Sequence, residues 1–167
     1  MDYTLMDYTL IDSPVGALLA LAADDALVGL YFVDAAHAPR PGDDWSASPR
    51  HAVLQDTRRQ LLEYFGERRR TFDLPLRPTG TPFQSQVWQT LQDIPYGSTR
   101  SYGAMAALLG QPGAARAVGA ANARNPISII VPCHRAIGAD GRLNGYAGGV
   151  DRKAALLKLE GAWPPQG

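Results

Sequence analysis

A cysteine and a histidine stand side by side at the end of an apolar run, Ile127-Ser128-Ile129-Ile130-Val131-Pro132-Cys133-His134-Arg135. Cys133 is the only cysteine of the 167-residue chain, and His134 is one of three histidines. A cysteine becomes a nucleophile when its surroundings favour the thiolate, and an imidazole can act as the base. Glu160, at the end of a predicted helix, is a candidate third group that would orient this imidazole. The alternative is that Cys133 is a small buried apolar residue and His134 an ordinary polar one.

The aliphatic residues before the pair predict a short buried strand over residues 127–131. Pro132 has no backbone N–H to donate and should end this strand. Adjacent side chains on a strand point to opposite faces, so Cys133 and His134 can cooperate only if the backbone turns there. The sequence therefore predicts a strand followed by a tight turn that holds the reactive pair.

Composition limits the classes of protein. A single cysteine leaves no internal disulfide and no multi-cysteine metal site, and a free thiol suits a reducing cytosol. No apolar run is long enough to span a bilayer, and the acidic N-terminus lacks the basic region of a secretory signal. We expect a cytoplasmic protein without metal, organic cofactor or membrane contact, and the arginine-rich composition favours a bacterial source. Residues 1–5 and 6–10 are the same pentapeptide, which we interpret as a duplicated start and not as a structural repeat.

Charge is divided unevenly along a chain whose formal net charge is zero. Residues 1–81 contain 8 arginines and 12 acidic residues, a net charge of −4. Residues 82–167 contain 8 basic and 4 acidic residues, a net charge of +4. A neutral protein with this division can present a positive face to nucleic acid.

The first half of the chain alternates apolar runs with turn signals. It predicts a three-strand antiparallel meander over residues 8–12, 17–23 and 27–33, a loop over residues 34–50, a helix over residues 51–65 and a strand over residues 72–76. Gly66 should end the helix. We interpret His37, His51 and the basic triplet at residues 68–70 as solvated. The break at residues 77–80 divides the chain into domains of residues 1–77 and 78–167.

The second half predicts mainly helices. Thr81, Pro82 and Gln84 form the capping box and first-turn proline of a helix that extends to Ile94. Two short helices, residues 102–109 and 114–124, are joined by the turn at residues 110–113, the pattern of a helix-turn-helix. Small residues on the second of these permit close approach to a partner, although a tightly packed alanine-rich core helix fits the pattern equally well. A Gly-rich loop at residues 144–149 suits the wall of a pocket, and a last helix covers residues 151–159.

These motifs together resemble the O6-alkylguanine-DNA alkyltransferase family, the methylated-DNA–protein-cysteine methyltransferases. The resemblance is carried by Asn125-Pro126, Ile129-Ile130-Val131-Pro132-Cys133-His134-Arg135, Gly145-Tyr146-Ala147-Gly148-Gly149, Leu156-Leu157 and Glu160-Gly161, with Ser101-Tyr102 and Ala114-Ala115-Arg116-Ala117-Val118-Gly119 upstream. It covers residues 82–161 closely and residues 8–76 by general layout. It implies an α/β two-domain fold. The N-terminal support domain would be a ribonuclease-H-like antiparallel sheet with a helix, and the DNA-binding alkyltransferase domain mostly helical and winged helix-turn-helix-like.

The resemblance also implies an activity, which is direct reversal of DNA damage. Cys133 would irreversibly accept the alkyl group of an O6-alkylguanine, with O4-alkylthymine left open as a second substrate, in a single turnover. His134, through a water, resembles the base, Glu160 the carboxylate that holds the imidazole, and Asn125 the residue that ties the cysteine turn to the helix-turn-helix. No cofactor is implied. Zinc, which some relatives bind through N-terminal cysteines, is not expected because this chain has none there.

The target base would be flipped out of duplex DNA from the minor-groove side. The residues with implied DNA contacts are Tyr102, which turns the 3′ phosphate, Arg116, which enters the base stack, Ala115 and Gln111. The residues with an implied place around the base are Ala136, Tyr146, Ala147 and Gly148. A monomer would suffice for this reaction.

Two further functions fit parts of the sequence. A non-catalytic lesion-binding protein would share the DNA-binding motifs, but Cys133 argues against it. A thiol hydrolase would share Cys133 and His134, but the helix-turn-helix argues against it. The two also differ in chemistry, because a hydrolase turns over and a lesion binder leaves the protein unmodified.

Overall fold

The structure is a computed structural model that describes residues 6–163, so the first copy of the repeated pentapeptide and the last four residues lie outside the described part. The chain divides into two compact units, Met1–Thr79 and Gly80–Gly167. None of the described helices is long and apolar enough to cross a membrane.

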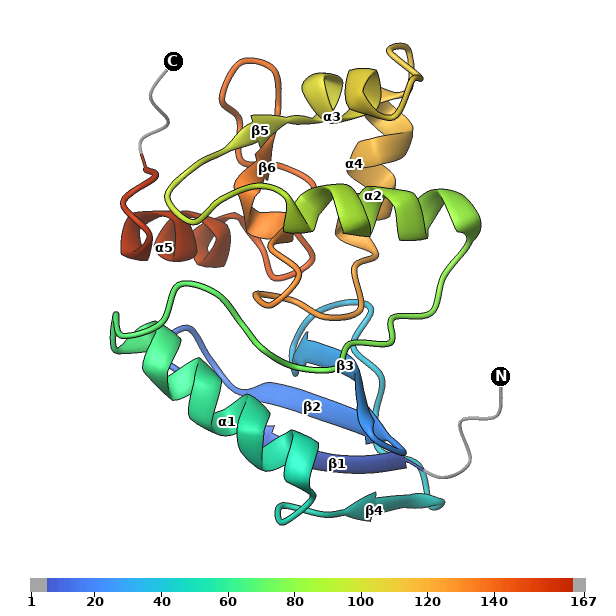
Figure 1. Ribbon diagram of the computed structural model, residues 1–167, viewed down its shortest axis with the longest axis vertical. Coiled ribbons are helices and arrows are strands. Elements are labelled where there is room, and N and C mark those ends of the chain that lie inside the picture. Colours follow the sequence, from blue (N-terminus) through green and yellow to red (C-terminus); the bar gives the residue numbers. More distant parts are fainter. Residues whose placement is uncertain (1–5, 164–167) are drawn as a thin grey trace. The chain divides into compact units, whose positions relative to one another are not determined.

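The first unit is built on a four-stranded sheet with the order β3-β2-β1-β4 (Figure 1). Strands β1 (Met6–Ile11), β2 (Leu18–Ala23) and β3 (Ala26–Phe32) form the predicted antiparallel meander. β4 (Trp45–Ala47) lies in the segment predicted as a loop and pairs in parallel with β1, so the expectation of a purely antiparallel sheet is wrong at this edge. The side chain of Ser48 donates a hydrogen bond of 2.6 Å to Asp7, a tertiary contact that the local sequence pattern does not reveal.

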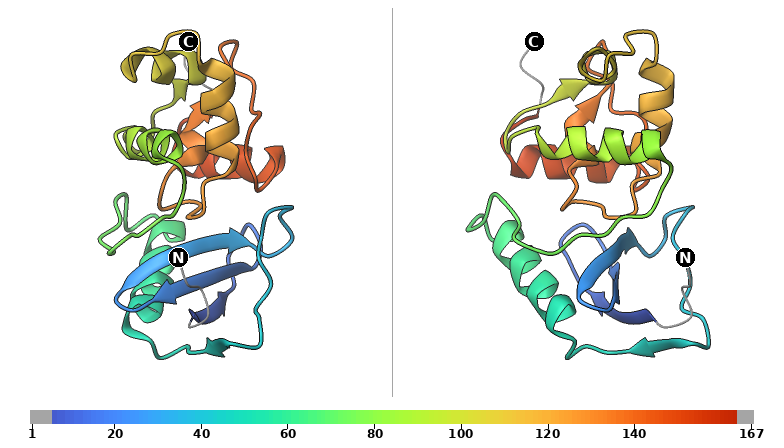
Figure 2. Two further views of the ribbon diagram at one scale, coloured as in Figure 1. Left: turned by 90° about the vertical axis from the view of Figure 1, so that its right-hand side faces the viewer. Right: turned by 45° about the vertical axis from the view of Figure 1, so that its right-hand side comes forward.

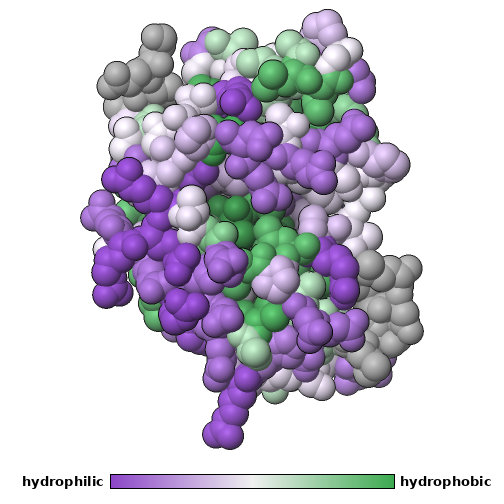
Figure 3. All heavy atoms as spheres, in the orientation of Figure 1, coloured by the Kyte–Doolittle hydropathy of each residue, from purple (hydrophilic) through white to green (hydrophobic). Residues whose placement is uncertain are grey.

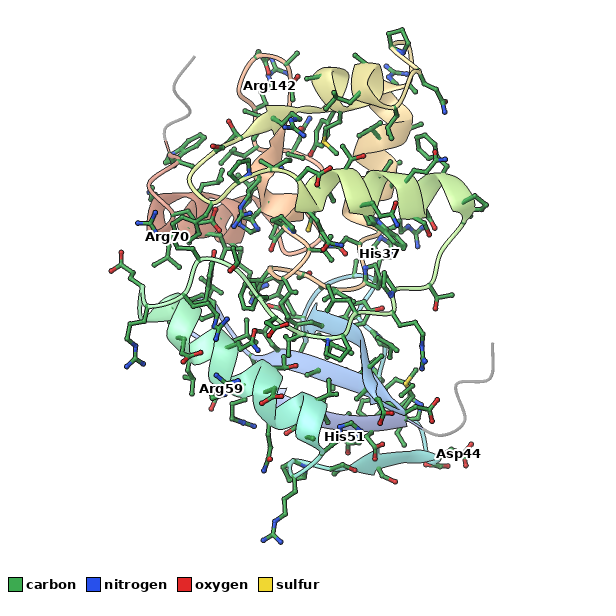
Figure 4. All side chains as sticks on the ribbon, in the orientation of Figure 1. His37, Asp44, His51, Arg59, Arg70 and Arg142 are labelled. Atoms are coloured by element: carbon green, nitrogen blue, oxygen red, sulfur yellow. The ribbon has the colours of Figure 1, made fainter. Side chains whose placement is uncertain are left out.

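Helix α1 (Ala52–Phe65) packs against this sheet and confirms the predicted helix (Figure 2). Its inner face buries Leu54, Leu61 and Tyr64 completely or nearly so. At its N-terminus the imidazole of His51, expected to be solvated, instead caps the helix by accepting a hydrogen bond of 3.2 Å from the Val53 amide. The outer face is largely hydrophilic (Figure 3), and Arg59 points away from the helix there (Figure 4).

The strand predicted over residues 72–76 is not formed. This segment makes only an isolated parallel bridge between Leu76 and Leu27. The amide of Leu27 donates to the carbonyl of Pro75 at 2.8 Å, and the amide of Arg77 donates back to Leu27 at 2.9 Å. Proline cannot donate to a ladder, so Pro75 interrupts the pairing that the apolar pattern suggested.

The second unit is mostly helical, as expected. Helix α2 (Pro82–Gln92) has the predicted capping box, and α5 (Val150–Leu159) is the predicted last helix. The two short helices of the expected helix-turn-helix are α3 (Tyr102–Leu108), capped by Ser101, and α4 (Ala115–Ala123). Trp88 of α2 is buried and donates its indole N–H to the carbonyl of Ala121 at 2.9 Å, which fixes α4 against α2.

Two very short strands complete this unit. β5 (Arg100–Ser101) pairs in parallel with β6 (Ala136–Ile137), and neither was predicted, because two residues carry no measurable periodicity. Their pairing brings the start of α3 next to the residues that follow Cys133 and His134. The fold therefore places the reactive pair beside the helix-turn-helix.

Candidate active site

The segment that leads to the cysteine is buried but is not the predicted strand. Residues 128–130 form a turn between an isolated bridge residue, Ile127, and a bend at Val131, and Cys133–Arg135 is one turn of 3-10 helix. Ile129 has a φ of 71°, a left-handed conformation that β-branched residues rarely adopt. Such a conformation costs about 1–3 kcal/mol and persists only where the surroundings impose it. The prediction of a strand is wrong because side-chain hydrogen bonds replace the ladder here.

Asn125 supplies those hydrogen bonds. Its side-chain amide nitrogen lies 2.9 Å from the carbonyl of Val131, 3.1 Å from that of Ile127 and 3.0 Å from Sγ of Cys133. Its oxygen accepts from the amide of Ile127 at 3.0 Å. One buried asparagine thus shapes the turn and holds the sulfur.

The thiol itself is shielded from solvent, with Cys133 only 1% exposed. Burial raises the pKa of Cys133 to about 11, although the hydrogen bond from Asn125 and the charge of Lys153 act in the opposite direction. At neutral pH the group is a thiol, which is a poor nucleophile. It needs a base that removes its proton when an electrophile arrives.

His134 and Glu160 form a buried pair suited to that task. Nε2 of His134 lies 2.7 Å from a carboxylate oxygen of Glu160, and both side chains are inaccessible to solvent. Burial lowers the pKa of His134 despite the nearby carboxylate, so the imidazole is neutral at rest. If Nε2 carries the proton and donates to Glu160, Nδ1 has a lone pair. Nδ1 is buried and has no hydrogen-bond partner among the described residues, so it can receive a proton.

Arg135 completes this pair and was not singled out from the sequence. Its Nε donates to Glu160 at 2.8 Å, and one terminal nitrogen donates to the carbonyl of Ile94 at 2.7 Å. Burial alone would raise the pKa of Glu160, but hydrogen bonds from His134 and Arg135 outweigh it and lower this pKa to about 2. The carboxylate therefore stays charged. The position of Arg135 directly after the candidate pair Cys133-His134 was the signal that could have revealed this residue.

A buried lysine was also missed. Nζ of Lys153 donates to Tyr102 Oη at 3.2 Å and to the carbonyls of Asn144 (2.8 Å) and Ala136. Burial lowers the pKa of Lys153 to about 8. Tyr102 Oη in turn donates to the carbonyl of Asn144. Lys153 stands three residues before the buried Leu156, on the apolar face of α5, which is how its burial could have been predicted.

A cleft of about 500 Å³ opens between the helix-turn-helix and the Gly-rich loop. Its lining includes Tyr102, Ala115, Arg116, Gly119, Asn144 and Gly145. Gly145 has a φ of 72°, and a Cβ there would come within 2.6 Å of Tyr102 Oη, so only glycine fits. Small residues of α4 leave this cleft open.

The structure brings some of the residues with expected DNA or base contacts together but not all. Tyr102, Ala115 and Arg116 line the cleft, whereas Gln111 is exposed on the turn before α4 and is not among the lining residues. Of the residues expected around the base, Ala136 and Tyr146 are buried, Ala147 and Gly148 are partly buried, and none lines this cleft. The unexpected lining residue Asn144 is exposed.

The fold and the site together define a class of protein. A buried thiol, a base and a carboxylate lie in a small helical domain that also carries two short helices and a cleft between them and a loop. In the described residues no group of three histidine, cysteine or acidic side chains is placed to hold a metal ion. This arrangement suits a helix-turn-helix domain that contains its own cysteine nucleophile.

Comparison with known proteins identifies the family. Residues 82–162 match the DNA-binding domain of 6-O-methylguanine DNA methyltransferase, and residues 6–78 match its ribonuclease-like domain. A methylated-DNA–protein-cysteine methyltransferase of Mycolicibacterium paratuberculosis is 49% identical over 157 residues, 93% of each protein. One of Methanosarcina acetivorans is 46% identical over 94% of this chain and 99% of that protein. The chain therefore belongs to the 6-O-methylguanine DNA methyltransferase family.

Solved structures agree with this assignment. The crystal structure of Mycobacterium tuberculosis OGT in complex with DNA has a TM-score of 0.85 and 47% identity, and covers 92% of this chain and 92% of that chain. The structure of the Mycobacterium tuberculosis O6-methylguanine methyltransferase has a TM-score of 0.84 and 45% identity, with 97% and 96% covered. The predicted family and fold class are confirmed, apart from the parallel strand β4.

Proposed function

We propose that this protein repairs DNA by direct reversal and that Cys133 takes the methyl or larger alkyl group from O6 of an alkylated guanine. It is a methylated-DNA–protein-cysteine methyltransferase that acts on DNA. The observation that carries the assignment of the nucleophile is Sγ of Cys133, buried 3.0 Å from the amide nitrogen of Asn125, in the residue that precedes His134 of the His134–Glu160 pair. A buried thiol held in this way is placed for reaction and protected from most other electrophiles.

The protons balance in the proposed step. As sulfur attacks the alkyl carbon, the bond from this carbon to O6 breaks and its electron pair stays with guanine. The thiol proton passes to Nδ1 of His134, directly or through one water, and Glu160 stabilises the imidazolium. The guanine anion then takes up one proton and becomes ordinary guanine. Arg135 keeps Glu160 ionised throughout.

The base reaches the thiol only if it leaves the duplex, because O6 of a stacked base is not accessible to a buried sulfur. Flipping costs a few kcal/mol of stacking and pairing. The small residues of α4 suit close approach in the minor groove, and Arg116 fills the space that the base leaves. Tyr102 turns the 3′ phosphate and faces the base, and Ala115 and Gln111 contact the backbone. Tyr146 and Ala136, with Ala147 and Gly148, enclose the base.

Each protein molecule acts once. A thioether does not hydrolyse under these conditions, and the sequence contains no second cysteine that could attack and regenerate Cys133. The reaction needs one monomer and one lesion, and O4-alkylthymine presents a similar alkyl–oxygen bond to the same sulfur. A free reactive thiol and a DNA substrate favour the bacterial cytoplasm, where the protein meets the chromosome.

The test is the mass of the intact protein after incubation with duplex DNA that contains O6-methylguanine. We expect the mass to rise by one methyl group in place of one hydrogen, at Cys133, with saturation at one equivalent of lesion. Cys133→Ala should bind the DNA without any change of mass. An unchanged wild-type mass with DNA bound would instead identify a lesion binder, and repair beyond one equivalent would contradict the single-use mechanism.

A further inference from the structure

A second buried asparagine, Asn122 on α4, is not explained by the mechanism above. Its side-chain nitrogen lies 3.2 Å from the carbonyl of Cys133, 3.1 Å from that of Gly145 and 3.4 Å from Tyr102 Oη. A carbonyl oxygen only accepts hydrogen bonds, so these neighbours fix which end of the amide is nitrogen. The residue is 0% exposed, and no described residue hydrogen-bonds to its oxygen.

The partners of Asn122 belong to three different parts of the site. Cys133 is the nucleophile, Gly145 is part of the loop that lines the cleft, and Tyr102 begins α3 and lines the same cleft. Asn122 itself lies on α4, the helix that carries Arg116. Its amide therefore connects the backbone of the residue that carries the reacting sulfur to the walls of the cleft.

Asn125 does a different task, although it lies only three residues away. All its hydrogen bonds go to the turn that it shapes, namely to Ile127, Val131 and Cys133. It sets the conformation of the cysteine turn but does not reach the cleft loop. Asn122 is the asparagine that relates this turn to the cleft.

The loop that Asn122 holds has no regular secondary structure, although Arg152 donates to the carbonyl of Gly148 at 3.4 Å and the amide of Gly149 donates to the carbonyl of Tyr146 at 3.1 Å. Residues 144–149 contain no helix or strand, and Gly145 and Gly149 have φ angles of 72° and 93°. The carbonyl of Asn144 is held by Tyr102 and Lys153, and the next carbonyl, that of Gly145, by Asn122. Without Asn122, the loop could move relative to the sulfur while the cysteine turn stayed intact.

We infer that Asn122 is a positioning residue that sets the distance between Sγ of Cys133 and a base held against Gly145 and Tyr102. This inference rests on the proposed transfer of an alkyl group from a base to Cys133. Displacement of reacting groups by about 1 Å can slow a reaction about 100-fold. The hydrogen bonds of Asn122 should therefore matter for transfer from a base that must be docked, and much less for a small electrophile that needs no docking.

The experiment compares Asn122→Leu, which keeps the branching at Cγ but has no donor, with Val118→Ala. Val118 is a fully buried residue of the same helix that makes no side-chain hydrogen bond to the site, and its truncation controls for lost stability. Single-turnover rates at saturating substrate are measured with O6-methylguanine duplex and with free O6-benzylguanine. The second-order rate constant is measured with iodoacetamide, and the melting temperature of each variant is recorded. We expect Asn122→Leu to slow both guanine reactions about 10- to 100-fold and to leave alkylation by iodoacetamide unchanged.

The inference is overturned if the guanine reactions of Asn122→Leu slow no more than those of Val118→Ala at equal fraction folded. It is also overturned if iodoacetamide and the guanine substrates slow equally, because Asn122 would then act on the thiol or the fold as a whole. Failure of the wild-type protein to accept a methyl group would contradict the proposed function itself. Normal transfer by both the wild type and Asn122→Leu would contradict only the role of Asn122.

Discussion

In the described residues of the first unit, the buried polar side chains are Thr9, Thr57 and Gln60, and none of them carries a charge. In those of the second unit, they are Asn122, Asn125, Ser128, His134, Arg135, Lys153 and Glu160. Four of these seven can ionise. Both units have an apolar core, so the two differ in the polar and charged side chains that each one buries in addition to this core.

Burial of an ion is costly unless a partner and hydrogen bonds compensate for lost hydration. The second unit meets this condition in two places. Arg135 and His134 form hydrogen bonds with Glu160, and Lys153 donates hydrogen bonds to three oxygen atoms. The same contacts that compensate the charges also place the groups that react. Substitutions of buried polar residues in the second unit should therefore change both the free energy of unfolding and the rate of methyl transfer. Such substitutions in the first unit should change only the free energy of unfolding.

The largest effect is expected from Glu160→Gln. The variant leaves Arg135 without its carboxylate and removes the charge that stabilises the imidazolium of His134. We expect the rate of methyl transfer to fall about 100- to 1000-fold and the free energy of unfolding to fall by about 3 kcal/mol. Single-turnover kinetics and urea unfolding measure the two. A large change in one quantity without the other would separate stability from reactivity and contradict the comparison.

The free energy of unfolding of the wild-type protein should depend on the same carboxylate at acidic pH. The pKa of Glu160 is about 2 in the folded state, below the ordinary value of 4.5. Because the folded pKa is the lower one, its stabilising contribution is present above pH 4.5 and disappears as the pH falls towards 2. The loss amounts to about 3 kcal/mol. Urea unfolding of wild type and Glu160→Gln from pH 6 to pH 2 should therefore converge, and parallel curves would contradict the assignment.

Arg116→Ala tests the exposed part of the second unit, where no buried charge is involved. Loss of this side chain should slow repair of duplex DNA about tenfold, because nothing then fills the gap in the stack. Reaction with free O6-benzylguanine should be unaffected, and stability should change little. Equal losses with both substrates would argue against a role in base flipping.

The smallest effect is expected in the first unit. Gln60 is buried and bonds at both ends to the backbone of Asp73, at 2.9 and 2.8 Å. Gln60→Leu should reduce the free energy of unfolding by about 1 kcal/mol, because Asp73 is exposed and its backbone can bond to water instead. Methyl transfer at equal fraction folded should match the wild type. A loss of transfer would show that the first unit is more than a support.

Local signals in the sequence predicted the helices well. The capping box at Thr81, the Ser101 cap and the apolar spacing of α1 and α5 depend on residues within one or two turns, so they can be read without the fold. β4 and the β5–β6 pair were missed because partners distant in sequence define them. The strand predicted over residues 127–131 is wrong. The aliphatic residues themselves do not show that hydrogen bonds from an asparagine side chain take the place of hydrogen bonds between strands.

The sequence predicted some of the site residues and missed others. Cys133, His134 and Glu160 were predicted as site residues from residue type and from the family resemblance, and the structure brings His134 and Glu160 together. Arg135 and Lys153 were overlooked because charged residues are expected at the surface. Asn122 was overlooked because an asparagine in a run of small residues has no distinctive spacing. What it contacts depends on three segments meeting in space.

The hydrogen bond from Asn125 to the sulfur has a consequence for the lifetime of the protein. Sγ of Cys133 is enclosed, with the amide nitrogen only 3.0 Å away, so an added methyl group must displace Asn125 or the turn that it shapes. Overpacking of a filled interior usually costs about 1–3 kcal/mol. A used molecule is then less stable than a fresh one. If Cys133 is methylated as proposed, proteolysis of unfolded protein should therefore remove methylated molecules faster than unmethylated ones.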